Sequence, residues 1–301
     1  MKSRSKFTVG VILSAVASLS WGISGTTLQL ISQDLKIPGP WMLSFRTFAV
    51  GAILLIIAAC LYGKRIFNVF KSKESIISII SYGVIGLALN LLTFYYAVQT
   101  GNATTATILQ YLAPIFIMLG NVFYKKEKPV IKDAISFFVA LIGVILVSTQ
   151  GDFTHLSIPM VSLLLGIGSG ITAAGYVVLP KKAGEDNSPI VVLGWGTLIA
   201  AVLFNVMHPF WVGVPTITPT FVATVSTVCL LGTIVPFSML LVANRYAPSD
   251  VISIMDAIQP ISTTILSMIF FKSEVTIVEW IGIIIVIIGI YILQFNGKSK
   301  A

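Results

Sequence analysis

Long apolar runs alternate with short polar segments along the whole chain. Each run is about 20 residues long, which is the length of a helix that crosses a bilayer. The runs show no two-residue alternation of the kind found in membrane barrels. The pattern therefore predicts an all-α polytopic membrane protein with ten transmembrane helices. The ten runs are Thr8–Ile31, Trp41–Leu61, Ile76–Val98, Thr104–Tyr124, Ile131–Ser148, Met160–Leu179, Ile190–Met207, Phe221–Ala243, Val251–Phe271 and Val275–Phe295.

Composition narrows the class in the same direction. Of the 301 residues, 56% are hydrophobic and only 10% are charged, whereas soluble domains contain about 25% charged residues. The high apolar content excludes a disordered chain. Two cysteines are too few for a disulfide-stabilised scaffold.

Lysine and arginine gather on one side of the predicted topology. With a cytoplasmic N-terminus, only Lys36 and Lys272 fall in outer segments, and Arg46 lies inside a run. This asymmetry follows the positive-inside rule and predicts a multi-pass protein of the cytoplasmic (inner) membrane with both termini in the cytoplasm. The net charge of +8 then indicates contact with anionic lipid headgroups of the bilayer and no nucleic-acid partner.

The second half of the chain repeats the first. At one constant offset, similar residues recur in the last two runs of each half; the pairs are Ala97 and Ala243, Pro114 and Pro260, Lys126 and Lys272, Asp133 and Glu279, and Gly143 and Gly289. We therefore expect two five-helix repeats, residues 1–150 and 151–301. Five spans are an odd number, so the second repeat is inverted, a construction typical of secondary transporters.

Small residues form stripes in the first helix of each predicted repeat. The stripes are Ser14, Ser18 and Gly22, and Gly166, Gly170 and Ala174. Small residues allow two helices to approach closely in lipid. We interpret the stripes as packing surfaces.

Several short motifs make the chain resemble the drug/metabolite transporter superfamily, specifically its EamA-like ten-helix members. The motifs are Trp21-Gly22, Phe45-Arg46, and the proline–glutamate–glycine series that ends each half, Pro114, Glu127 and Gly143, then Pro260, Glu274, Gly282 and Gly289. The family's glutamine before the first glycine of the last helix is replaced here by Glu279 or Trp280. The resemblance covers nearly the whole chain. It implies an inner-membrane carrier of small organic metabolites with a central cavity between the halves, and it slightly favours export.

Two ionisable residues lie inside predicted spans, where charges are costly and usually functional. Asp256 lies midway along the ninth run, four residues before Pro260, and Gln110 holds the matching place before Pro114. Each proline leaves a carbonyl one turn back without its donor. Asp256 is expected to bind a cationic or amino group of the solute, or a proton; the alternative is a structural lock with Arg46 or Gln259. Arg46 is the second candidate, and its alternative is a side chain that extends to the outer interface.

Amide and aromatic residues complete the predicted solute site. Small-molecule sites combine apolar walls with a few polar groups, and aromatic faces hold ammonium groups. Packing against lipid or neighbouring helices is the alternative for each residue. The full predicted set of substrate-binding residues is Asp256, Gln110, Tyr111, Asn90, Phe94, Tyr95, Gln99, Trp21, Arg46, Tyr176, Trp195 and Gln259.

Catalytic and metal motifs do not emerge from the sequence. His155, His208, Cys60 and Cys229 show no metal-ligand spacing. We expect no enzyme activity, no bound cofactor and no metal. The prediction is a secondary transporter for small metabolites, amino acids or related solutes among them, driven by a solute or proton gradient. An intramembrane enzyme or a non-transporting sensor or scaffold remains the alternative, and the oligomeric state stays open.

Overall fold

The computed structural model describes residues 2–126, 130–243 and 245–296, and every regular element in these ranges is helical. Glu127 of the family motif lies outside the described residues, as do Lys128, Lys298 and Lys300 among the predicted cytoplasmic lysines.

The first five spans occupy the first half of the chain. The elements are α1 (Lys2–Gln29) with η1 (Leu30–Asp34), α2 (Gly39–Tyr62) with η2 (Gly63–Phe70), α3 (Lys73–Ser81) with η3 (Tyr82–Leu89) and α4 (Asn90–Thr100), α5 (Ala103–Gln110) with α6 (Ala113–Lys125), and α7 (Ile131–Thr149). Proline in the first turn of α2 and side-chain caps from Ser72 on α3 and Asn102 on α5 mark three of the starts.

The second five spans follow the same plan. The elements are α8 (Met160–Val178), the short α9 (Lys181–Glu185), α10 (Pro189–Met207), α11 (Pro219–Cys229) with η4 (Leu230–Ile234) and α12 (Val235–Ala243), α13 (Ser249–Met255) with α14 (Ile258–Phe271), and α15 (Ile277–Asn296). Both the third and the eighth span contain a π-helical segment, η3 and η4. Both the fourth and the ninth span are broken.

The ten predicted runs are confirmed as helices. Nine described helices are long and apolar enough to cross a membrane, and Ile258–Phe271 is a shorter apolar helix. The ninth span is shorter by this measure because it divides between α13 and α14. The chain is therefore an all-α polytopic membrane protein with ten spans.

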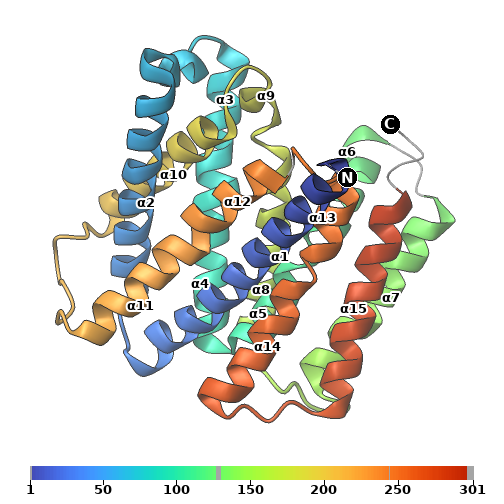
Figure 1. Ribbon diagram of the computed structural model, residues 1–301. Coiled ribbons are helices and arrows are strands. Elements are labelled where there is room, and N and C mark those ends of the chain that lie inside the picture. Colours follow the sequence, from blue (N-terminus) through green and yellow to red (C-terminus); the bar gives the residue numbers. More distant parts are fainter. Residues whose placement is uncertain (1, 127–129, 244, 297–301) are drawn as a thin grey trace.

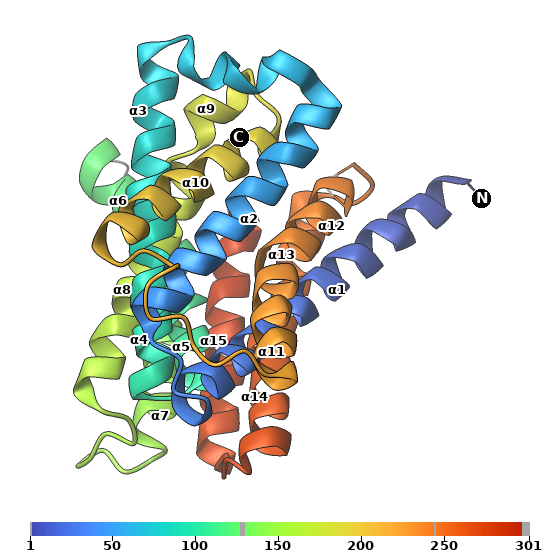
Figure 2. The same ribbon diagram turned by 90° about the vertical axis from the view of Figure 1, so that its left-hand side faces the viewer.

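The helices pair as expected if a two-fold axis relates the two halves. The second span packs on the seventh (α2 on α10) and the fifth on the tenth (α7 on α15) (Figure 1). The first span contacts the eighth and ninth (α12 and α14), and the sixth, α8, contacts the third and fourth in turn. Figure 2 shows α1 crossing the bundle obliquely, with its N-terminal part extending beyond its neighbours.

Glycine allows a close contact between α7 and α15. A Cβ on Gly143 would lie 2.7 Å from the carbonyl oxygen of Gly282, and a Cβ on Gly282 would lie 2.8 Å from that of Gly143. No side chain fits at either position, so the two backbones pack directly against each other.

Candidate functional site

A cavity of about 310 Å³ lies in the middle of the bundle, and residues from both halves line it. Its lining is mostly apolar, with polar groups contributed by most of the spans, the two broken spans among them. These polar and aromatic lining residues are Trp21, Ser24, Arg46, Thr47, Asn90, Phe94, Gln110, Tyr111, Tyr176, Thr197, Thr233, Phe237, Asp256, Gln259 and Gln294. Nine of the predicted residues therefore face one space, and their role in binding stays a prediction.

Asp256 lies at the break between α13 and α14 and lines the cavity. Its carboxylate oxygen Oδ1 accepts a hydrogen bond of 3.1 Å from the hydroxyl of Ser18 on α1. Among the described residues, the Asp256 carboxylate forms no ion pair or hydrogen bond with the side chain of Arg46 or Gln259, which was the structural alternative. The backbone carbonyl of Asp256 was expected to lack a donor because of Pro260. It accepts a 3.0 Å hydrogen bond from the amide N–H of Gln259. The backbone tightens into a turn there, because proline cannot donate.

Gln110 occupies the corresponding break between α5 and α6. Its side-chain Nε2 donates to the hydroxyl of Ser169 at 2.9 Å and to Oδ1 of Asn90 at 3.3 Å. Asn90 in turn donates to the carbonyl of Ser169 at 2.9 Å and to the hydroxyl of Thr172 at 3.2 Å. The neutral break is therefore held by a network of amides and hydroxyls.

Arg46 points inward and is only 8% exposed. One terminal nitrogen donates to the carbonyl of Gly232 at 3.4 Å and to the hydroxyl of Thr233 at 3.3 Å. The alternative of a side chain that extends to the outer interface is thus wrong, since both partners lie in η4, in the middle of the eighth span. No carboxylate pairs with Arg46 in the described part of the chain.

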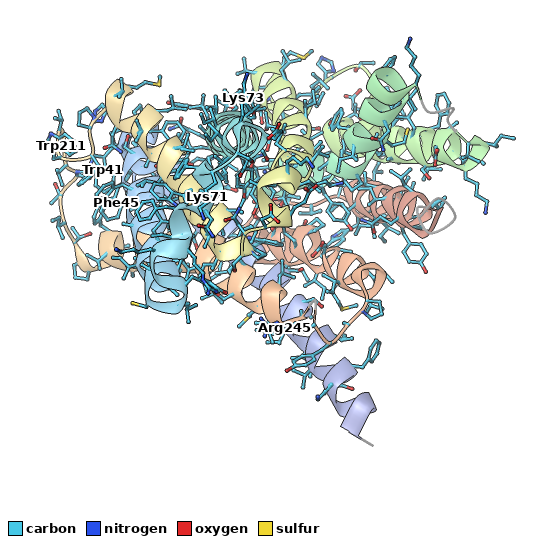
Figure 3. The ribbon with its side chains drawn as sticks, turned by 90° about the horizontal axis from the view of Figure 1, so that it is seen from above. Trp41, Phe45, Lys71, Lys73, Trp211 and Arg245 are labelled. Carbon is cyan, nitrogen blue, oxygen red and sulfur yellow. The ribbon has the colours of Figure 1, made fainter. Side chains whose placement is uncertain are left out.

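The helix that carries Arg46 is tied to the loop between α10 and α11. Trp41 Nε1 donates to the carbonyl of Phe210 at 2.7 Å, and the hydroxyl of Ser44 donates to the carbonyl of His208 at 2.6 Å. Trp41 also stacks on Phe45 with ring centroids 5.1 Å apart. Figure 3 shows Trp41, Phe45 and Trp211 on one flank of the bundle. These bonds hold the start of α2, and with it the position of Arg46.

Aromatic rings form one wall of the cavity. Trp21 meets Phe237 edge-on at 5.6 Å between centroids, and Tyr176 meets the same Phe237 at 5.7 Å. Phe94 and Tyr111 line the space from the third and fourth spans. This wall offers π faces and apolar surface to a solute.

Three predicted site residues lie away from the cavity lining. Tyr95 is fully buried and donates its hydroxyl to the carbonyl of Ile37 at 2.8 Å. Gln99 donates to the carbonyl of Ser32 at 3.5 Å. Trp195 donates to the carbonyl of Ile66 at 2.8 Å and packs on Phe70. Each of the three makes a contact that fixes neighbouring helices, which matches the packing alternative.

Sequence reasoning missed several polar residues of the site. Ser18 and Ser169 contact the two break residues; Ser18 belongs to a predicted packing stripe, and Ser169 lies next to one. A small-residue stripe does not show whether a serine forms a hydrogen bond with its side chain or only allows two helices to pack closely. Thr197, Thr233 and Gln294 are single polar residues in apolar runs, and nothing in their local sequence distinguishes them.

Comparison with known proteins gives one family. The model of the EamA-like transporter family matches residues 8–149 and 160–295. The chain belongs to the EamA-like transporter family. The predicted resemblance is therefore confirmed.

Two relatives match this EamA-like protein over nearly its whole length. One, named the uncharacterized inner membrane transporter YicL of Salmonella typhimurium, is 24% identical over 295 residues and covers 97% of each chain. The uncharacterized transporter YwfM of Bacillus subtilis is 21% identical over 95% of this chain and 93% of its own. A solved crystal structure superposes with a TM-score of 0.61 at 15% identity, covering 98% of this chain and 99% of its own, which shows the shared fold.

Groups of three or more His, Cys, Asp or Glu side chains that could hold a metal ion do not occur among the described residues. The two free cysteines differ in burial, Cys60 being exposed and Cys229 buried. The chemical resources of the EamA-like cavity are thus one carboxylate, one guanidinium, amides, hydroxyls and aromatic rings.

Proposed function

We propose that this EamA-like protein is a secondary transporter that moves small organic metabolites, amino acids or related solutes among them, across the cytoplasmic membrane by alternating access. Both termini lie in the cytoplasm in this proposal, and export is the favoured direction. The observation that carries it is the cavity itself, which is lined by residues at both helix breaks and by Asp256 and Arg46, two opposite charges that form no ion pair among the described residues.

The two broken spans support a mechanism in which the halves rock. Discontinuous helices at the middle of the membrane place backbone and side-chain polar groups at the binding sites of many secondary transporters. Here Ser18 of the first half bonds Asp256 of the second, and Gln110 of the first bonds Ser169 of the second.

The relatives support the location. YicL is named an inner membrane transporter, and the exposed basic residues Lys64, Arg65, Lys71 and Lys73 cluster between the second and third spans. The N-terminal end of α1 and the C-terminal end of α15 point toward the same end of the bundle (Figure 1). A single basic end fits the positive-inside rule with that end in the cytoplasm.

Asp256 is the proposed contact for an amino group of the solute or for a coupling proton. One of its carboxylate oxygens is bound by Ser18, and the side chain lines the cavity. Charge-assisted hydrogen bonds contribute about 1.5–3 kcal/mol. Its removal should therefore reduce the movement of amino-group solutes by roughly 10- to 100-fold.

Flux of a radiolabelled amino-acid panel in proteoliposomes tests the proposal. Wild-type protein should move at least one solute above the rate of empty vesicles, and Asp256→Asn should lose that flux while remaining folded. Asp152→Asn is the matched control, because Asp152 lies in an exposed loop and should leave the flux unchanged. If no member of a broad panel moves with wild-type protein, the transporter proposal is contradicted and the scaffold alternative gains weight.

A further inference from the structure

We infer that Arg46 forms an anion subsite in the cavity, and that the transported solute carries a carboxylate which this guanidinium binds. The inference rests on the proposed transport function and specifies the chemistry of its solute.

The hydrogen bonding of Arg46 is incomplete for a group so deeply buried. A guanidinium has five N–H donors, and the bonds of Arg46 in the described structure come from one terminal nitrogen, at 3.3 and 3.4 Å. Both distances exceed the usual range of about 2.7–3.2 Å. A buried charge with unused donors is costly unless a partner completes it.

The described carboxylates near the membrane interior do not serve as that partner. Asp256 accepts from Ser18, and Glu279 accepts from Gln150 at 2.9 Å at the start of α15. Ion pairs in the described residues join His155 with Asp152 and Lys182 with Glu185, all of them exposed. The missing counter-ion must come from what occupies the cavity.

The surroundings of Arg46 are shaped to leave its guanidinium open to the cavity. A Cβ on Gly232 would lie 2.8 Å from its bonded nitrogen, so glycine at this position makes room for the charge. The anchored start of α2 keeps the side chain in place. Thr197 also lines the cavity, is 3% exposed, and its hydroxyl has no hydrogen-bond partner. The oxygen itself is buried, so Thr197 becomes a second donor to an anion when its side chain turns toward the cavity.

A carboxylate fits this site best. Its two oxygens match the planar fork of a guanidinium in a bidentate pair. Asp256 lines the same cavity with the opposite charge, and the Trp21, Tyr176 and Phe237 wall offers apolar surface. The solute class is therefore a small carboxylate on an apolar body, with room for an amino group near Asp256.

Binding of matched probes to the full-length protein in detergent tests the subsite. The probes are monocarboxylates from acetate to 3-phenylpropionate, each paired with its neutral primary amide. Calorimetry on wild-type protein should show at least one carboxylate bound about tenfold or more tightly than its amide, since charge-assisted bonds are lost in the amide. Equal affinity for every pair, or no binding of any carboxylate, overturns the inference.

Variants assign the preference to named residues. Arg46→Gln should abolish the difference between acid and amide, and Arg46→Lys should retain part of it as a point charge without the fork. Thr197→Val should weaken carboxylate binding several-fold and leave the amide unchanged. Arg245→Gln is the control, because it removes an exposed guanidinium near the end of α12 (Figure 3) and should change nothing.

If Arg46→Gln does not fold, Arg46→Lys and Thr197→Val still test the subsite. A full carboxylate preference in both of these overturns the subsite. Failure of the subsite and failure of transport are distinguishable: amine flux without carboxylate binding removes only Arg46 as an anion site, whereas absent flux with intact carboxylate binding removes only transport.

Discussion

The two broken spans share a backbone plan and differ in what stands at the break. In the fourth span, α5 ends at Gln110 and α6 begins at Ala113; in the ninth, α13 ends at Met255 and α14 begins at Ile258. Each break is followed by a proline in the next first turn, Pro114 or Pro260. The first break holds a neutral amide and the second a carboxylate.

The difference lies in how fully each side chain is satisfied by the protein. Gln110 donates to Ser169 and Asn90, and Asn90 extends the network to the sixth span. The Asp256 carboxylate accepts one hydrogen bond in the described structure, from Ser18, and its side chain lines the cavity with acceptor capacity to spare. The neutral break is held closed by its own network, whereas the charged break keeps capacity for a ligand. We therefore expect Gln110 to contribute mainly to stability and Asp256 mainly to transport.

Replacing Gln110 should have the largest effect on stability. Gln110→Leu removes two interhelical hydrogen bonds and leaves the buried hydroxyl of Ser169 without this partner. The free energy of unfolding should fall by about 2 kcal/mol, measured by titration with a denaturing detergent. Asp256→Asn should change the same quantity by less than about 1 kcal/mol, because it removes a charge from an apolar setting. Equal losses in both variants would contradict the division of roles.

Removing the two partner hydroxyls should have a smaller effect. Ser169→Ala should lower the free energy of unfolding by about 0.6 kcal/mol, the average for an interhelical hydrogen bond in a membrane protein. Ser18→Ala should cost about as much, but should also change the affinity for amino-group solutes, because it alters the only bond that Asp256 makes to another side chain in the described structure. A change in solute affinity in Ser169→Ala and none in Ser18→Ala would reverse the comparison.

The prolines should matter least. Pro114 and Pro260 lie in the first turns of α6 and α14, where the missing N–H would have had no helical partner. Pro114→Ala and Pro260→Ala should each change the free energy of unfolding by less than about 0.5 kcal/mol, since a break already separates the helices. A change near 3 kcal/mol, the value for a helix interior, would show that these spans are continuous in the membrane.

Much of the fold follows from local sequence. Apolar runs of about 20 residues predict the spans, and caps and prolines mark the ends, as Asn102 does by accepting from the amide N–H of Thr105 at 2.8 Å. The sequence does not predict the break at Asp256, although it contains the carboxylate and, four residues later, the proline that accompany it. The division at residue 150 stays a prediction, because the two family matches end and begin near it without testing it.

Nine of the predicted site residues line one cavity and three do not. The local sequence pattern does not distinguish the two groups. Tyr95 and Phe94 are adjacent in one helix, yet Phe94 faces the cavity and Tyr95 is bonded to the carbonyl of Ile37. Neighbouring residues on a helix point in directions about 100° apart, and only the partner helices decide which direction meets the cavity.

By itself, the sequence determined the membrane class, the ten spans, the family and the presence of Asp256 and Arg46 inside apolar runs, because each depends on composition or on short motifs. The tertiary structure alone decided what these charges contact. It paired Asp256 with Ser18, more than two hundred residues away, without an ion pair to Arg46 among the described residues, and it turned Arg46 inward. Such contacts join distant segments, and which donor meets which acceptor depends on how the helices pack and not on the residues that flank either one.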